Sequence, residues 1–549
     1  MQHKFIESDV LVIGGGMAGS FAAIKAREQG LDVTLVDKGY AGKSGSTPYA
    51  FHFQVFDPER GHRLDEWMNH VNTRGEYINN RRWTEISYKD SFARFQDLVS
   101  WGVKFLKGAD GEIVRRGPPI TVVEAVILEE RDFAHVLRKQ AIEKGVRILD
   151  KIMVTELIKR DGRVVGAVGI PLDSYQLYVF GAKATVMSAG CASFKPAGWP
   201  VSELTADADA MAYRAGAEIT GKEFNDTHDT DAENPATTLG MLWGKVECPP
   251  APWMNPLKGV NAEGAEIRGL PGALTLDIYF EAHAGRAPIH GKTPEGSMQR
   301  IVGGASAGMS IHTAEGMLPI NESCASSVPG LFAAGDSCGT MQVGAMYSGV
   351  GAGLAGAAVT GARAGLGAAE YALQTEKPSI SEREITGLNE TVHQPIKRKG
   401  GFSPRWVTQV LQNAMVPYFI MYVKHEDRLK AALTIVEFMR DHLIPKLIAR
   451  DPHELRLAHE TRNMVLNAEM KLRASLFRTE SRGTHYREDY PSRDDPTWLA
   501  WVILKQEQGK MKVFKRAVPK EWWPDLSKSY EKRYPARFPG EVVPSGRRK

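Results

Sequence analysis

Two glycine-containing stretches, far apart in the chain, decide the fold. The first is Asp9-Val10-Leu11-Val12-Ile13-Gly14-Gly15-Gly16-Met17-Ala18-Gly19, in which a short apolar run leads into a glycine turn. A helical pattern follows, and the apolar run 33–36 then ends in Asp37. A G-x-G-x-x-G turn between a strand and a helix is typical of a β-α-β unit that binds a dinucleotide.

Each glycine of this turn has a physical role. Gly14 permits the tight turn, Gly16 lets a pyrophosphate approach the backbone, and Gly19 lets the helix pack closely on the strand. The helix N-terminus supplies N–H groups for the phosphate charge. Asp37 is placed to accept the hydroxyls of an adenosine ribose, and an acid there disfavours the 2′-phosphate of NADP. This turn alone does not distinguish FAD from NAD.

The second stretch is Leu331-Phe332-Ala333-Ala334-Gly335-Asp336. It resembles the second conserved patch of FAD proteins, in which the acid meets the ribityl or pyrophosphate region. Because the two patches lie so far apart, we expect one FAD domain that is interrupted by an insertion. Residues 229–303 are rich in Pro, Gly, Asn and Trp, with weak periodicity, and we interpret them as an inserted cap.

Composition excludes several classes of protein. The chain has 549 residues, a formal net charge of +4, 43% apolar and 24% charged residues, which is ordinary globular usage and excludes a largely disordered chain. No apolar run is long enough for a membrane-spanning helix, and the short polar N-terminus leaves no room for a signal peptide, so we expect a cytoplasmic protein. The four cysteines form no C-x-x-C, which disfavours both a disulfide framework and an iron–sulfur cluster held within the chain.

The remaining chain divides by pattern. Residues 152–160 and 163–170 form a predicted hairpin around Asp161-Gly162, followed by two predicted strands at 175–182 and 184–189. Residues 406–477 are strongly helical and amphipathic. Residues 505–549 contain 13 Lys or Arg and five Asp or Glu. The predicted units are an FAD-binding domain in two parts, 1–228 and 304–376, a cap at 229–303, a linker at 377–404, a helical domain at 405–504 and a basic tail at 505–549.

At this point the chain resembles the flavoprotein subunits of succinate dehydrogenase and fumarate reductase, a superfamily that includes L-aspartate oxidase and the α subunit of adenylylsulfate reductase. The resemblance rests on both FAD patches, on residues 205–217, and most specifically on Arg478-Thr479-Glu480-Ser481-Arg482-Gly483-Thr484-His485-Tyr486-Arg487. It implies an α/β fold with a discontinuous Rossmann-like FAD-binding domain, an inserted α+β capping domain and a C-terminal helical domain. It also implies redox chemistry at the flavin.

The chain departs from the family pattern at the substrate side. Gly45 stands where the succinate and fumarate enzymes attach the flavin to a His, so we predict non-covalent FAD. His228 matches the family's substrate-side histidine, but the second one, expected near Ala305, is missing, and Tyr347 stands where an Arg is expected. A dianionic substrate needs such arginines. Simple succinate or fumarate chemistry is therefore disfavoured, and residues 346–351 look closer to adenylylsulfate reductase.

The predicted catalytic residues share a polar side chain near the expected flavin or substrate: His228, His52, Tyr347, Arg286 and His312. A structural role is the alternative for the three histidines, and a solvent-exposed place in the cap is the alternative for Arg286. The predicted FAD-binding residues follow the family motifs: Gly14, Gly16, Met17, Ala18, Gly19, Asp37, Lys38, Ser44, Gly45, Ser46, Thr47, Val154, Ser188, Ala189, Gly190, Asp207, Gly335, Asp336, Ser348, Gly349 and Val350. No metal site is predicted, because His283 and His290 lack tight ligand spacing.

The leading hypothesis is an FAD-dependent oxidoreductase subunit that exchanges electrons between a small-molecule substrate and an iron–sulfur, ferredoxin-like partner. The alternative is a self-contained FAD oxidase or dehydrogenase of a small organic acid or unsaturated substrate, and a non-catalytic FAD scaffold is a third class. We expect the basic tail to dock on a protein, with Trp522-Trp523 as a buried anchor, and not on nucleic acid. The oligomeric state stays open.

Overall fold

The structure of the chain is a computed structural model. It describes residues 3–118, 121–130, 133–195, 203–226, 230–231, 259–265, 274–292, 298–302, 308–347 and 349–543. Most of the predicted cap lies outside these ranges. Within them, no helix is both long and apolar enough to cross a membrane.

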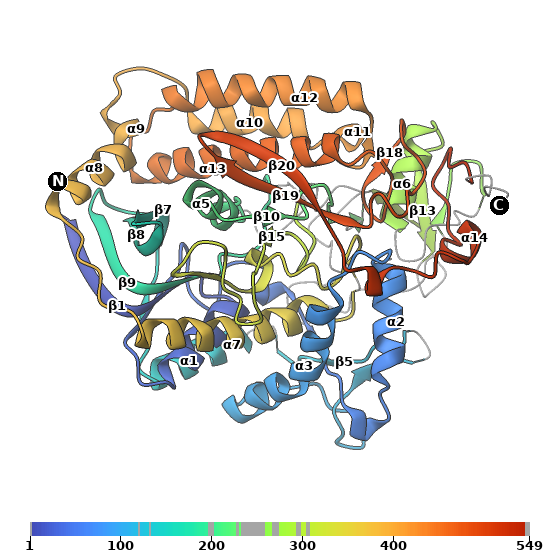
Figure 1. The fold of residues 1–549 in the computed structure, drawn as a ribbon, viewed down its shortest axis with the longest axis horizontal. Coiled ribbons are helices and arrows are strands. Elements are labelled where there is room, and N and C mark those ends of the chain that lie inside the picture. The colour runs from blue at the N-terminus through green and yellow to red at the C-terminus, as the bar shows by residue number, and fades with distance from the viewer. Residues whose placement is uncertain are drawn as a thin grey trace.

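A seven-stranded sheet forms the centre of the molecule (Figure 1). Its order is β6-β2-β1-β9-β8-β7, and β16 also pairs with β9. The strands from β6 to β9, together with β16, run parallel, whereas β7 and β8 form an antiparallel hairpin. The strands span His3–Ile13 (β1), Val33–Val36 (β2), Arg147–Leu149 (β6), Ile152–Arg160 (β7), Arg163–Pro171 (β8), Leu177–Met187 (β9) and Leu331–Ala333 (β16).

Helices α1 (Met17–Arg27) and α7 (Ala352–Leu373) cross in close contact below this sheet (Figure 1). A Cβ atom on Gly361 would lie 2.3 Å from the Ala18 carbonyl oxygen, and one on Gly365 would lie 2.3 Å from that of Ala22. The small residues of α7 are therefore required for the two backbones to approach. Helix α3 (Arg81–Trp101) packs on α7, and α4 (Phe133–Glu143) packs on α1.

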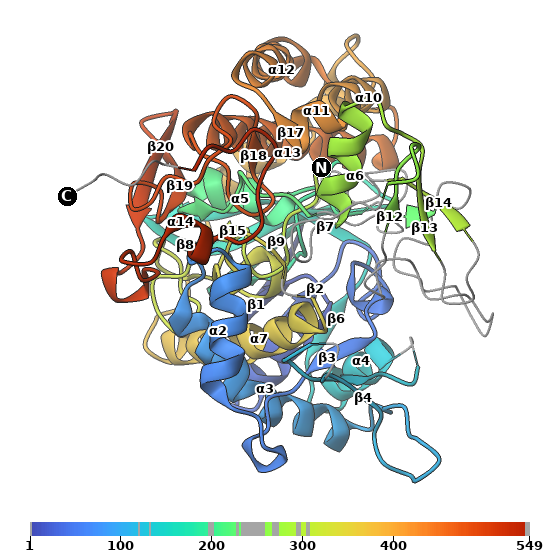
Figure 2. The same ribbon diagram turned by 90° about the vertical axis from the view of Figure 1, so that its right-hand side faces the viewer.

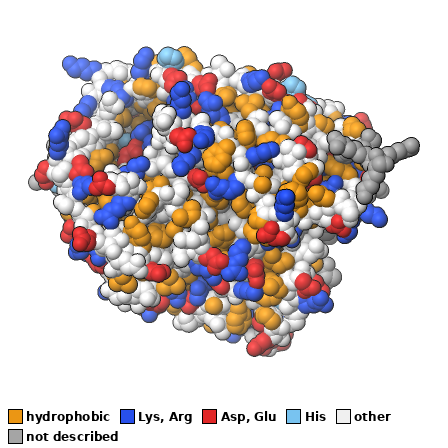
Figure 3. All heavy atoms as spheres, viewed as in Figure 1, with side chains coloured by type: hydrophobic (Ala, Val, Ile, Leu, Met, Phe, Trp, Pro, Cys, Tyr) orange, Lys and Arg blue, Asp and Glu red, His pale blue; other side chains and the backbone are white. Residues whose placement is uncertain are grey.

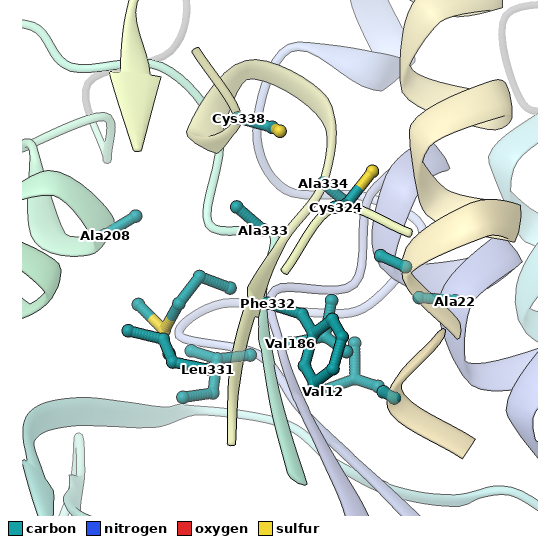
Figure 4. Close-up of a cluster of buried hydrophobic side chains, with 14 of the residues drawn as sticks. Val12, Ala22, Val186, Ala208, Cys324, Leu331, Phe332, Ala333, Ala334 and Cys338 are labelled. Carbon is teal, nitrogen blue, oxygen red and sulfur yellow. The ribbon is translucent and has the colours of Figure 1, made fainter. Parts of the chain in front are cut away.

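The two predicted FAD patches meet in the core of this domain. Val12 of β1, Val186 of β9 and Phe332 of β16 are buried side by side (Figure 4). Strand β16 pairs with β9 in parallel, which places Gly335 and Asp336 next to the turn after β1. The two patches therefore belong to one sheet, as the prediction of a discontinuous FAD domain requires.

The helical domain lies on the opposite side of the sheet from α7 and α3 (Figures 1 and 2). Its central helix is α13 (Pro452–Phe477), which packs against α10 (Pro404–Met415), α12 (Glu426–Phe438) and α5 (Asp207–Ala215). A second sheet, of order β15-β10-β19-β20, joins this part to the FAD domain. Its strands are Gly316–Met317, Ile219–Thr220, Ala500–Glu507 and Lys510–Ala517.

The smaller elements complete the molecule. The helices are Leu64–Arg74 (α2), Leu274–His283 (α6), Glu382–Val392 (α8), Gln394–Lys397 (α9), Tyr418–Met421 (α11) and Tyr530–Arg533 (α14). The strands are His52–Gln54 (β3), Arg115–Arg116 (β4), Ala125–Ile127 (β5), Thr230–Asp231 (β11), Gly259–Val260 (β12), Ile289–Lys292 (β13), Met298–Val302 (β14), Val423–Lys424 (β17) and Tyr486–Arg487 (β18).

Three features correct the sequence predictions. The strands predicted at 175–182 and 184–189 are one strand, β9, because its backbone pairs with β1 on both sides of the predicted break at Lys183. The stretch 377–404, predicted as a linker, contains α8 and α9. The boundary at 504 falls inside β19.

The described part of the predicted basic tail, residues 505–543, is an integral part of the fold. Tyr530, Tyr534 and Phe538 are buried, and the Trp523 indole N–H donates to the Val518 carbonyl within the same segment. Lys, Arg, Asp and Glu side chains are interspersed on the face seen in Figure 3. The segment therefore packs on its own chain, and Trp522 is already half-buried against Trp501.

Candidate cofactor and active site

A cleft opens where the parallel strands end, and it contains about 850 Å³ of empty space, including the part open to solvent. Seventeen of the predicted FAD-binding residues line it: Gly14, Gly16, Met17, Ala18, Asp37, Lys38, Ser44, Gly45, Ser46, Thr47, Val154, Ser188, Ala189, Gly190, Asp207, Gly335 and Asp336. They come from both parts of the FAD domain, so the cleft exists only in the folded chain.

The glycine turn after β1 has no room for side chains. Gly14 has a φ of +106°, and a Cβ atom there would lie 2.2 Å from the Ser188 carbonyl oxygen. A Cβ atom on Gly19 would lie 1.8 Å from the Gly14 carbonyl oxygen, so Gly19 supports the turn without lining the cleft. Helix α1 begins after Gly16, which has no side chain to cap it. In the described part of the chain only Met17 N of the first turn meets a side chain, so the other first-turn N–H groups are available to an anion.

Asp37 organises the loops on one side of the cleft. Its carboxylate accepts hydrogen bonds from Gly15 N (2.7 Å), Gly39 N (2.7 Å) and the Ser44 hydroxyl (2.6 Å). The loop that contains Ser44 also places the Thr47 hydroxyl 3.0 Å from Met17 N, which donates to it. The loop predicted to lie along the flavin thus folds onto the glycine turn.

Lys38 connects the cleft to the helical domain. Its ammonium lies 2.8 Å from Asp207 and 3.0 Å from Glu460 of α13. Burial disfavours the charged forms of Lys38 and Glu460, but the attraction of opposite charges outweighs burial. The two acids raise the pKa of Lys38, and Lys38 together with neighbouring cations lowers the pKa of Glu460 to about 2. Lys38 lines the cleft as predicted, but its charge is engaged by protein carboxylates.

The second patch pairs an acid with a histidine. His312 Nδ1 lies 2.8 Å from Asp336 Oδ2. Burial lowers the pKa of His312, but the Asp336 carboxylate outweighs burial and raises that pKa to about 9. His312 is therefore protonated at neutral pH, and its Nε2 has no hydrogen-bond partner among the described residues.

These features fit FAD. The glycine turn, the N-terminus of helix α1 and the acid after β2 form a cradle for a dinucleotide, and a Cβ atom at Gly14 would clash with the Ser188 carbonyl and displace the turn. Family models support the same conclusion: residues 9–234 match an FAD binding domain, and residues 408–531 match a fumarate reductase flavoprotein C-terminal domain. The chain belongs to the succinate dehydrogenase and fumarate reductase flavoprotein superfamily. It is an FAD-dependent oxidoreductase.

Individual relatives align with this flavoprotein over nearly its whole length. It is 27% identical to a fumarate reductase (CoM/CoB) subunit of Methanothermobacter marburgensis, over 92% of this chain and 98% of that protein. Among solved structures, Sdh1 of Mycobacterium smegmatis has a TM-score of 0.80 at 24% identity, covering 94% of this chain and 95% of that chain. Adenylylsulfate reductase of Archaeoglobus fulgidus also has a TM-score of 0.80, at 21% identity, covering 96% and 98%. The predicted fold class and cofactor are confirmed.

Two of the predicted catalytic residues of this flavoprotein lie together. The rings of Tyr347 and His312 are 5.3 Å apart, and the Tyr347 hydroxyl accepts from Gly353 N at 3.0 Å. Burial has the largest influence on both side chains: it lowers the pKa of His312 and raises that of Tyr347. Asp226, which sequence analysis missed, is buried nearby, and its charge raises the pKa of both. One feature of the sequence indicated Asp226, namely its position two residues before His228.

Cys191 is a second missed residue. Its thiol, His312 and Asp336 place one potential ligand atom each within 4.8 Å of one another. Burial raises the pKa of Cys191, and His312 is protonated, so a metal ion would have to displace two protons. No metal site is assigned to this group.

Sequence analysis also missed Glu203, which lines the cleft and accepts a hydrogen bond from Gly45 N at 3.0 Å.

The other predicted residues lie elsewhere. His52 of β3 is half-buried beside Phe51, and burial and Arg116 lower its pKa to about 4. Arg286 pairs with Glu281 at 2.7 Å inside the cap, and its catalytic role stays a prediction. Gly349 and Val350 do not line the cleft, because their segment packs beside α2. His228 and Ser348 lie outside the described residues.

The segment 478–487, which carries the most specific part of the resemblance, is a buried network of ion pairs. Arg478 and Arg482 both bind Glu480 at 2.7 Å, and all three side chains are fully buried. His485 lies 3.0 Å from Lys424 Nζ. The network fixes the helical domain against the FAD domain, which agrees with a structural and not a catalytic role for these residues.

Proposed function

We propose that this chain holds one FAD non-covalently in the cleft and exchanges electrons between a small substrate and an iron–sulfur partner protein. The observation that carries the proposal is the cleft itself, which is lined by both FAD patches. Non-covalent binding is supported by Gly45, which lines the cleft at the position where related enzymes carry the attaching histidine.

When bound, FAD would accept or deliver two electrons as a hydride and pass them on singly. The chain's own residues would bind and orient it. The first turn of α1 would meet the pyrophosphate, and Asp37 would meet the adenosine ribose. The loop 43–47 and Asp336 would lie along the rest of the cofactor.

Proton transfer is assigned to His312. Its Nδ1 faces Asp336, which stabilises the imidazolium, and its Nε2 is the proton donor. The adjoining Tyr347 keeps its proton at neutral pH, because burial raises its pKa. Tyr347 and Asp226 are positioning residues in this scheme.

The iron–sulfur partner rests on two observations. The sequence has four widely spaced cysteines, and Cys191, Cys324 and Cys338 are free and buried. Clusters need about four thiolates at tight spacing. Electrons that leave the flavin one at a time would therefore pass to a carrier on another protein, as the family resemblance implies.

The test starts from purified, FAD-loaded chain. Candidate substrates are added without oxygen, and bleaching of the visible flavin band is recorded. Reoxidation is then compared with oxygen alone and with a ferredoxin. Fast reoxidation by the ferredoxin and slow reoxidation by oxygen are expected. Fast reoxidation by oxygen alone would instead support a self-contained oxidase, and absence of bound flavin would refute the proposal.

His312→Gln tests the proton donor in the same assay. After dithionite has reduced the flavin, the variant should slow reoxidation of the flavin by the oxidised form of the substrate, because that step delivers a hydride and a proton to the substrate. Reoxidation by the ferredoxin should stay unchanged. The matched control is His62→Gln, a half-buried histidine just before α2 that pairs with Glu124. Equal rates of substrate-dependent flavin reoxidation in native protein and His312→Gln would contradict the assignment.

A further inference from the structure

Arg74 ends helix α2 beside the segment that leads into α7. Its Nε donates to the Tyr347 carbonyl oxygen at 3.4 Å. The following residue fixes this approach, because Ala345 N donates to the Gly75 carbonyl at 3.1 Å and a Cβ atom on Gly75 would lie 2.5 Å from the Val343 carbonyl oxygen. The two backbones are locked together, so the guanidinium has a defined position.

The charge of Arg74 is not balanced by an acid of the described residues. No Asp or Glu among them lies within ion-pair distance of it, and burial lowers its pKa. By contrast, the fully buried Arg478, Arg482, Arg487 and Arg493 each pair with an acid. A desolvated cation without a counter-charge is costly, and such a cost is retained where a ligand supplies the missing anion.

His70 adds a second polar group one helical turn earlier. Its Nε2 is buried and has no hydrogen-bond partner in the part of the chain that the structure describes. Burial lowers the pKa of His70, and the nearby Arg74 lowers it further, so the ring is neutral and free to donate one N–H. Residues at i and i+4 of a helix lie on one face, so His70 and Arg74 present donors to the same side.

This pair adjoins the reaction centre. Tyr347, whose carbonyl binds Arg74, lies 5.3 Å from His312, and His312 contacts Asp336 of the cleft. The side chains of His70 and Arg74 are each half-buried, so part of each side chain stays exposed to solvent. The arrangement offers an anion a cation and a neutral donor next to the proposed proton donor.

We propose that Arg74 and His70 bind an oxyanion group of the substrate, a carboxylate or a sulfur or phosphorus oxyanion. Arg74 would provide charge-assisted, two-pronged hydrogen bonds, and His70 would provide a neutral one. The inference rests on the proposed function and narrows it, because it makes the substrate a small anion.

Calorimetric titration of the FAD-loaded chain tests this inference. The probes are malonate, inorganic phosphate, and malonamide as a neutral analogue of malonate. We expect one of the two anions to bind, and malonamide not to bind. In Arg74→Gln the Kd of that anion should rise by about tenfold or more, since a charged hydrogen bond is lost. His70→Asn should weaken binding less, and Arg74→Lys should lie between native protein and Arg74→Gln.

The control is Arg63→Gln, which changes an exposed arginine of the same region that already pairs with Asp65. It should bind the anion like native protein. Anion binding in Arg74→Gln within twofold of native, or no anion binding to the native chain, would overturn the inference. Because calorimetry reports binding and the visible spectrum reports flavin, a colourless chain refutes the proposed function separately from this subsite.

Discussion

Glu541→Gln tests whether the C-terminal segment is a structural part of the flavoprotein. The Glu541 side chain is fully buried. It accepts two hydrogen bonds from Arg493 Nη1 at 3.0 Å, one from Phe538 N at 2.8 Å, and one from the Tyr530 hydroxyl. Arg493 also binds Glu76, at 2.6 Å, and Glu76 lies in the turn that follows Arg74. The segment thus holds the end of α2 through Arg493.

Removal of one partner from a buried ion pair costs roughly 3–5 kcal/mol. Arg493 keeps Glu76, and the introduced amide could still hydrogen-bond, so we expect a loss of about 2–3 kcal/mol in the free energy of unfolding. Urea unfolding followed by tryptophan fluorescence measures this loss. Glu531→Gln, in the same segment but exposed, should change the free energy by less than about 0.5 kcal/mol. An equally small change in Glu541→Gln would refute the packing described here.

Two further predictions concern the cleft. Gly14→Ala should abolish FAD binding, because its Cβ would lie 2.2 Å from the Ser188 carbonyl oxygen. The control is Gly30→Ala, which also has a positive φ but has open space around it and should keep the flavin. The measurement is the ratio of bound flavin to protein in each purified variant. His312, whose pKa rises from 6.5 to about 9, contributes stability that is present below pH 6.5 and is lost as pH rises through 9. This loss in the free energy of unfolding is roughly 3 kcal/mol and should vanish in Asp336→Asn. Urea unfolding of the FAD-free chain at pH 6.5 and 9.5 measures it, and equal losses in native protein and Asp336→Asn would contradict the prediction.

Local sequence patterns were enough to predict much of the fold. The run 9–19 specifies a strand, a turn and a helix by itself, since Gly14 and Gly19 have steric roles that only glycine fills. The hairpin of β7 and β8 was set by Asp161-Gly162. One local signal was overlooked: Ser381 and Glu384 form a capping box that begins α8 inside the predicted linker.

The active site was harder to predict, because it depends on partners distant in sequence. His312 became a candidate by resemblance, but its protonation depends on Asp336, which approaches only after β16 pairs with β9. Arg74 carried no motif, and only the structure shows that it lacks an acidic partner among the described residues. The segment 505–549 was interpreted from its charge, whereas its buried Tyr534 and Phe538 decide where it lies.

The central claim is that this chain holds intact, unattached FAD between the glycine turn and Asp336. Acid precipitation of the purified, FAD-saturated protein tests it most directly. We predict that the supernatant contains close to one FAD per chain and that the pellet is colourless. A chain that takes up no flavin, or a chromophore that stays in the pellet, would contradict the account.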